Sequence, residues 1–259
     1  FRLPAFGWRP APGTRPNMKI AVLSDIHGNM DAFEQVLADI DTRGIASVLS
    51  LGDNIGYGAE PERVVQALKT RGIPSVLGNH ELAAKKPGFL GWFNPAARTS
   101  LTMTFRMLSA ESLAFIAGLP DYRVIHGCRL VHGFPPDSPT LYLFQVLPEA
   151  KQKALRDLPE RICFVGHTHV LDLLSHDGSK IADVAFKEDA NRLDPALQYL
   201  VNIGSVGQPR DGDPRAKYVI WDPAESTLDI RCVPYDAEAA AAKIIAAGMP
   251  GEHAHRLLG

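Results

Sequence analysis

Two histidines stand one residue apart in the stretch "FVGHTHV", directly after an apolar run and a glycine. In an extended segment, residues i and i+2 point to the same side, so the imidazoles of His167 and His169 would converge on one point. Such a pair is a weak indication by itself, because a solvated turn with two histidines has the same pattern. The pair indicates a site only if the rest of the chain supplies partners for it.

Further polar side chains stand directly after predicted strands elsewhere in the chain. A second i, i+2 pair, Asp25 and His27, follows the apolar run "KIAVLS". The other polar groups in this position are Asp53, Asn79, His80, Glu81 and His132. Ligands of open α/β sheets bind at the carboxyl ends of the strands, so we expect all these groups to meet at one place.

Seven of these groups form a plausible set of metal ligands. Two carboxylates, one amide oxygen and four imidazoles are too many for one tetrahedral zinc ion and suit two ions that share a bridge. Nitrogen and oxygen donors without a thiolate favour manganese, iron, zinc, cobalt or nickel over magnesium or calcium. Two divalent ions and two carboxylates leave a positive charge, even with a bridging hydroxide. The predicted site therefore suits an anionic substrate, and phosphate esters are the obvious class.

The elements that must position these groups alternate regularly from Met18 onward. Strands are predicted at "KIAVLS", "ASVLSL" and "IPSVLG", with amphipathic helices over residues 29–44 and 60–72 between them. This alternation predicts βαβ units and a largely parallel sheet. Residues 82–119 interrupt it as a helical insertion or cap. From Tyr122 onward strands dominate and predict a second, mixed sheet, and a terminal helix is expected in "DAEAAAAKIIAAGM".

Composition excludes several classes of protein. The chain has 259 residues, 46 % hydrophobic and 22 % charged, as is usual for a soluble globular protein. Its net charge of −2 gives no basic surface, so we expect neither stable nucleic-acid binding nor a polybasic membrane patch. No apolar run approaches the roughly 20 residues that span a bilayer. Three widely spaced cysteines, Cys128, Cys163 and Cys232, predict buried free thiols and a cytoplasmic location.

The first residues differ from the rest of the chain. Residues 1–17 are rich in proline and arginine and lack the apolar core of a signal peptide, so we expect an N-terminal tail there. No linker composition follows, which predicts a single domain over residues 18–259. Whether the tail is native and ordered is left open by the sequence.

Taken in order, the motifs "SDIHGN", "LGDNIGYG", "LGNHE", "VHG" and "GHTH" resemble those of the calcineurin-like metallophosphoesterase superfamily. "VNIGSVGQPRDGDPRAKYVIWD" is similar to the C-terminal part of its small bacterial branch of predicted phosphodiesterases. The resemblance spans nearly all of residues 18–233. It implies a four-layer α/β/β/α sandwich of two mixed sheets, with residues 82–119 as a helical cap insertion.

The resemblance also implies which groups bind which ion. Three ligands would bind one metal, three would bind the other, and one carboxylate would bridge them. The ligands of the first metal would be Asp25, His27 and His169, and those of the second would be Asn79, His132 and His167. Asp53 would be the bridge. The expected cofactors are two divalent transition metal ions, manganese first, with iron, zinc, cobalt or nickel as alternatives.

Four further residues are candidates for catalysis or substrate binding. His80 stands beside a ligand without being one, and resembles the general acid of the family. Glu81 would orient it, although aspartate is commoner than glutamate here in the bacterial branch. Asn29 is most simply a helix cap, but the N-terminus of that helix would face the site, so Asn29 is also a candidate for binding phosphate. Arg210 in "GSVGQPR" would reach an anion.

The expected function is that of a dinuclear metal-dependent phosphodiesterase acting on a small phosphate ester such as a nucleotide. A metal-bridging hydroxide would attack phosphorus and His80 would protonate the leaving group. The alternatives are a phosphomonoesterase, a protein phosphatase or a dinucleoside-polyphosphate phosphatase. A non-catalytic scaffold is the alternative of another class, although a scaffold need not keep seven ligands and His80. The natural substrate, the native metal pair and the oligomeric state are left open.

Several aromatic and histidine residues receive simpler interpretations. Phe89, Trp92 and Phe93 are expected to pack the helical insertion rather than to stack on a base. His126 is expected in the turn of a hairpin. The remaining histidines are expected to be solvated in turns or in the C-terminal tail; they are His176, His253 and His255.

Overall fold

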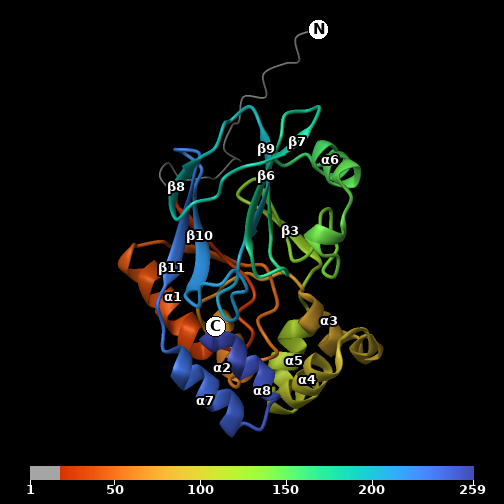
Figure 1. Cartoon of the computed structure of the whole chain (residues 1–259), viewed down its shortest axis with the longest axis vertical. Coiled ribbons are helices and arrows are strands. Elements are labelled where there is room, and N and C mark those ends of the chain that lie inside the picture. The colour runs from red at the N-terminus through yellow and green to blue at the C-terminus, as the bar shows by residue number, and fades with distance from the viewer. Residues whose placement is uncertain (1–17) are drawn as a thin grey trace.

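The structure is a computed structural model that describes residues 18–259, so the predicted N-terminal tail lies outside the described residues. Two β-sheets pack face to face, and helices cover the outer faces (Figure 1). The predicted α/β class with two mixed sheets is confirmed. No helix within residues 18–259 is long and apolar enough to cross a membrane.

The first sheet has five strands in the order β2-β1-β10-β11-β8. The β1–β2 pair is parallel, and the other neighbours are antiparallel. In sequence order the strands are β1 Ile20–Leu23, β2 Ser47–Ser50, β8 Asp189–Arg192, β10 Ala216–Asp222 and β11 Thr227–Val233.

The second sheet has six strands in the order β3-β4-β5-β9-β6-β7. Its centre, β4-β5-β9, is parallel, and its edges are antiparallel. The strands are β3 Tyr122–Ile125, β4 Cys128–Val131, β5 Ile162–Val165, β6 Leu171–His176, β7 Ile181–Asp183 and β9 Gln198–Ile203. The predicted hairpin is present between β3 and β4, and His126 lies in its turn with a φ of 52°.

Helices complete the layers. Helices α1 and α7 contact each other beside the first sheet, α6 packs on the second sheet, and α3, α4 and α5 gather at one end of the molecule near α8 (Figure 1). The α-helices are α1 Met30–Thr42, α2 Pro61–Thr70, α3 Asn79–Lys85, α4 Pro95–Met107, α5 Ala110–Ala117, α6 Pro148–Asp157, α7 Ala237–Ala246 and α8 Gly251–Leu258. Two 3₁₀ helices are η1 Pro87–Trp92 and η2 Leu143–Gln145.

Strand β1 shows why the central strands are apolar throughout. Ile20 and Val22 face the second sheet, while Ala21 and Leu23 face α1, because successive side chains alternate across a strand. Both faces of the sheet are covered, so both sets are buried and no polar residue interrupts the run. This burial leaves the end of the strand as the nearest place for polar groups.

One predicted strand is absent, and the structure has three elements that we did not expect. "IPSVLG" forms only an isolated parallel bridge between Ser75 and Ser50, because the extended segment is too short for a ladder. Helix α6 was not expected, since Leu155 is the only residue of α6 that is buried. Strand β8 and helix α8 were also not expected. Helix α8 buries His253 to 2 % exposure, and His176 at the end of β6 is 1 % exposed, so neither histidine is solvated.

Candidate metal centre

The predicted ligand side chains lie together where strands of both sheets end. Asp25 follows β1, Asp53 follows β2, His132 follows β4 and His167 follows β5. All seven are at most 2 % exposed; they are Asp25, His27, Asp53, Asn79, His132, His167 and His169. Burial of so many polar groups has a large free-energy cost unless they are paired or bind metals.

The backbone at this site is unusual. Five of the seven residues have a left-handed φ: 54° for Asp25, 51° for His27, 50° for Asp53, 68° for His167 and 63° for His169. Each such conformation costs on the order of 1 kcal/mol and persists only where the surroundings impose it. His167 and His169 are therefore not in the extended segment that we expected, and they turn to different neighbours.

Each of the four histidines points one ring nitrogen at a backbone carbonyl oxygen. A carbonyl only accepts hydrogen bonds, so that nitrogen carries the proton and the other presents a lone pair when the ring is neutral. The pairs are His27 Nδ1 with Ile55 at 3.1 Å, His132 Nδ1 with Leu51 at 2.9 Å, His169 Nδ1 with Gln208 at 2.6 Å and His167 Nε2 with Thr140 at 3.2 Å.

The remaining ring nitrogens face one another. His27 Nε2 is 3.1 Å from His169 Nε2, and His132 Nε2 is 3.2 Å from His167 Nδ1. Two lone pairs at that distance repel each other unless a cation lies between or beside them. Asp25 Oδ1, which has no hydrogen-bond partner among the described residues, lies 3.2 Å from His169 Nε2. The set of side chains therefore fits cations, because imidazole lone pairs and carboxylate oxygens are aimed at one another.

Three overlapping groups of candidate ligands are found by distance, and one of them, His27, Asp53 and His80, shares a residue with each of the other two. Asp25, His27 and His169 form one group whose donor atoms lie within 4.8 Å of one another, and Asp53, His132 and His167 form another. Asp53 Oδ2 lies 3.2 Å from His132 Nε2 and 3.9 Å from His27 Nε2, which places it between the groups.

Asn79 completes the second group. Its Oδ1 lies 3.1 Å from His132 Nε2. The Asn79 amide oxygen is therefore placed as a further candidate ligand beside His132.

The electrostatics of the site also favour cations. Burial alone would raise the pKa of Asp25, but the imidazoles of His169 and His132 hold it well below its usual value. Burial lowers the pKa of His167 to about 3 and of His169 to about 4, so both are neutral ligands near pH 7. For His132, burial is outweighed by the charges of Asp53 and Asp25, which raise its pKa to about 9.

His80 lies in an aromatic box beside the centre. Its ring is 4.6 Å from the ring of Tyr57 and 5.2 Å from that of Phe93, measured between centroids. Its Nε2 is 3.8 Å from Asp53 Oδ2, whereas a Cβ placed on Gly56 would lie 2.1 Å from its Nδ1. Only Nε2 therefore faces the centre. Burial lowers the pKa of His80 well below its usual value.

Glu81 does not contact the ring of His80. Its carboxylate accepts hydrogen bonds from the backbone N–H groups of Asp53 at 2.9 Å, Asn54 at 2.7 Å and Gly78 at 3.0 Å. It also accepts one from Asn54 Nδ2 at 3.1 Å. Glu81 thus fixes the loop that carries Asp53, which is a positioning role rather than the predicted orientation of His80.

The two predicted substrate-binding residues differ. Asn29 Oδ1 accepts from the Ala32 N–H at 3.1 Å, and its Nδ2 donates to the Gly207 carbonyl at 2.9 Å, so its side chain caps α1 and ties a loop. Arg210 is exposed; it donates its backbone N–H to the His169 carbonyl oxygen at 3.1 Å and its guanidinium to Gln208 Oε1 at 3.0 Å. Arg210 therefore stands at the rim of the centre with its charge available to an anion.

Sequence reasoning missed the aromatic residues that touch the centre. Tyr57, with a left-handed φ of 60°, stacks within 4.5 Å of His27 on one side and of His253 of α8 on the other. Tyr142 lies on the ring of His167 with a centroid distance of 3.6 Å. The only signal for Tyr57 was its place in "GDNIGYG". No local pattern identifies Tyr142 or His253, which are brought in by η2 and α8.

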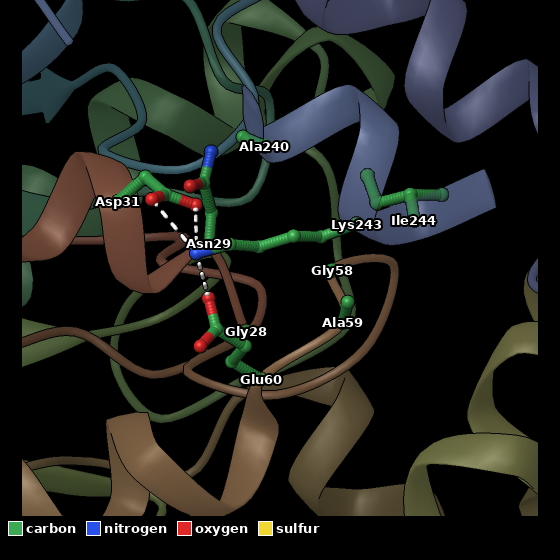
Figure 2. A pocket seen from close by; sticks show the side chains of 9 residues that line it. All are labelled: Gly28, Asn29, Asp31, Gly58, Ala59, Glu60, Ala240, Lys243 and Ile244. Carbon is green, nitrogen blue, oxygen red and sulfur yellow. Dashed lines mark hydrogen bonds and ion pairs between the residues drawn. The ribbon is translucent and has the colours of Figure 1, made fainter. Parts of the chain in front are cut away.

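Behind the centre, Lys243 of α7 links the first turn of α1 to the N-cap residue of α2. Figure 2 shows its Nζ between Asp31 and Glu60, with distances of 2.8 Å to each carboxylate. Gly28 and Gly58 line the same small pocket, and these residues flank His27 and Tyr57 in the sequence. Because Lys243 already pairs with both carboxylates that line this pocket, we interpret it as a clamp between helix ends and not as a substrate site.

Comparisons with known proteins agree with this geometry. The family model of the calcineurin-like phosphoesterase superfamily domain matches residues 18–226. An uncharacterized protein of Methanocaldococcus jannaschii is 34 % identical over 236 residues, which cover 89 % of this chain and 93 % of the relative. The matches therefore do not single out a bacterial branch.

Two solved structures resemble the chain closely in fold. A metallophosphoesterase from Sphaerobacter thermophilus has a TM-score of 0.79 and 33 % identity, covering 93 % of this chain and 98 % of its own. A hypothetical protein from Pyrococcus horikoshii has a TM-score of 0.74 at 18 % identity, covering 92 % and 97 %. The second likeness concerns the fold alone.

We expect Lys243→Met to lower the free energy of unfolding by about 1 kcal/mol, because two partly buried carboxylates lose the cation that they share. The effect is no larger because solvent screens ion pairs that are partly exposed. Urea denaturation measures this. Lys153→Met is the matched control, since Lys153 pairs with Asp157 but is 70 % exposed. Equal stability of the two variants would contradict the clamp.

Proposed function

The chain belongs to the calcineurin-like phosphoesterase superfamily and is a metallophosphoesterase, and on this premise we propose that it is a dinuclear metal-dependent phosphodiesterase acting on small phosphate esters. The observation that carries the proposal is the orientation of the four histidines. Each is fixed by a carbonyl oxygen so that its lone pair points to one of two positions on either side of Asp53. This pattern is what two metal ions with a shared ligand need.

The residues of the chain would divide the work. Bound divalent ions would neutralise the phosphate oxygens and make a water nucleophilic near neutral pH. Arg210 would bind a phosphate oxygen from the rim of the centre, at the side of His169. His80 would donate a proton from Nε2 to the leaving alkoxide, because its other nitrogen faces Gly56. The negative charge of the bound ester favours the protonated form of His80 that this step requires.

The charge of the site favours a diester over a monoester. Among residues 18–259, Arg210 is the one cationic side chain that we assign to the substrate. A diester carries one negative charge, whereas a monoester carries up to two. The nitrogen and oxygen ligands, without a thiolate, support manganese as the metal, with iron, zinc, cobalt or nickel as alternatives. The three cysteines are free thiols, and Cys128 and Cys163 are buried as predicted, whereas Cys232 is partly exposed. Free thiols support the cytoplasm as the location.

Metal content and hydrolysis together test the proposal. We expect about two ions per chain and hydrolysis of bis(p-nitrophenyl) phosphate in preference to p-nitrophenyl phosphate, lost on chelation and restored by manganese. Asp53→Asn should weaken the binding of both ions and abolish activity, since Asp53 lies between the two ligand groups. Asp177→Asn, at an exposed turn, is the control. Full activity of Asp53→Asn would show that the assignment of the bridge is wrong.

Replacement of His80 separates an enzyme from a scaffold. His80→Ala should keep its metal ions but lower kcat by about 10²-fold or more, because it removes a general acid and no ligand. Metal analysis and steady-state kinetics on the same preparation measure both effects. Unchanged kcat with intact metal content would exclude His80 as the acid.

Gly56→Ala tests the position of the same ring without replacing it. A Cβ at this residue would lie 2.1 Å from His80 Nδ1, so the imidazole must shift. Displacement of a catalytic group by about 1 Å can cost about 10²-fold in rate, and we expect a loss of that order in kcat. Gly88→Ala, where a Cβ meets nothing within 4 Å, should leave kcat unchanged. Circular dichroism confirms that both variants fold, and equal kcat values would contradict the account.

A further inference from the structure

Trp92 stands beside the metal centre with its ring parallel to that of a candidate ligand. Its centroid is 6.4 Å from that of His167 and 6.3 Å from that of Tyr142, with interplanar angles of 24° and 14°. Tyr142 and His167 are themselves stacked at 3.6 Å. A ring that is almost equally far from both members of so close a stack lies at its side, not on its face.

Packing of the helical segment does not explain Trp92. Phe93 is 6 % exposed and serves as the anchor of η1, in agreement with its predicted packing role. Trp92 is 47 % exposed, which contradicts that role for this residue. Phe89 stacks on it with a centroid distance of 5.3 Å and an angle of 17°. Phe93 packs against it at right angles, with a centroid distance of 5.2 Å. Because 47 % of Trp92 is exposed, these two rings leave part of the indole face open to solvent.

The turn that presents Trp92 is held firmly. The Arg98 guanidinium donates to the carbonyl oxygens of Phe93 at 3.1 Å and Gly91 at 3.4 Å. The Phe93 ring packs edge-on against that of His80 at 5.2 Å. The open indole face therefore has a fixed place relative to the proposed general acid, and a ligand would not have to order it.

The surroundings combine a cationic region with a flat apolar one. Arg210 is exposed and donates its backbone N–H to the carbonyl oxygen of His169, which places a cation beside the centre. A molecule held here by its phosphate thus has a flat, partly exposed aromatic surface next to it. A ligand that carries both an anion and a flat ring would use both regions.

We propose that the substrate is a nucleoside phosphate ester, whose base stacks on the open face of Trp92 while its phosphate lies at the metal centre. This inference rests on the proposed function. A base can stack on an aromatic side chain without hydrogen bonds to its edge. Trp92 could therefore bind a base although we assign no polar side chain to that base. Tyr142 would hold His167 in place at the border between the two regions.

The test compares two ligands that differ only in the base. Calorimetric titration of the manganese-loaded chain with AMP and with ribose 5-phosphate should show AMP binding at least about 10-fold more tightly. Trp92→Ala should bring this ratio close to one, and Trp92→Phe, which keeps a ring, should retain most of it. Ile245→Ala, which removes an apolar side chain that is 55 % exposed on α7, is the control and should leave the ratio unchanged. Metal content should be the same in all variants.

Equal binding of AMP and ribose 5-phosphate, or no measurable binding of either, would overturn the inference. So would an unchanged ratio in Trp92→Ala. If that variant altered only the oligomeric state, the aromatic surface would be an interface between copies and the proposal would be wrong. Because binding needs no turnover, AMP binding through Trp92 without phosphodiester hydrolysis would contradict the proposed function alone. Hydrolysis with an unchanged ratio would contradict the base site alone.

Discussion

Two buried carboxylates and four imidazoles share one small volume, and the rest of the structure serves to keep them there. Without cations, the lone pairs of His27 and His169 face each other at 3.1 Å and Asp25 Oδ1 has no hydrogen-bond partner among the described residues. The fold therefore has to supply much of the free energy that assembles the site, because these lone pairs repel one another when no cation is bound. Burial of apolar side chains between the two sheets is the main source of that free energy.

The free-energy cost of holding these side chains together is visible in the backbone conformation. Five of the seven ligand positions have a left-handed φ, and glycines such as Gly78 leave room where a Cβ would lie 2.1 Å from Asp53 Oδ1. Glu81 and Lys243 then fix a loop and two helix ends from behind, one through three backbone N–H groups and the other through two carboxylates. Residues that touch neither substrate nor metal thus determine the geometry of those that would.

The sequence predicted the sheets and the place of the polar clusters, because apolar runs followed by short polar motifs mark buried strands and their ends. It could not predict that Tyr142 lies on His167, since the contact joins segments without a shared pattern. It missed α8 because this short helix buries a histidine, His253, on its apolar side. It misjudged Trp92 because composition does not tell whether an aromatic side chain points into the core or to solvent.

Anomalous diffraction from crystals grown with manganese tests the central claim most directly. We predict two peaks that share Asp53 as a ligand, one beside His27 and His169 and the other beside His132 and His167. Occupied positions of this kind would show that the histidine lone pairs are arranged for two ions. A single peak, or manganese bound away from Asp53, would contradict the account.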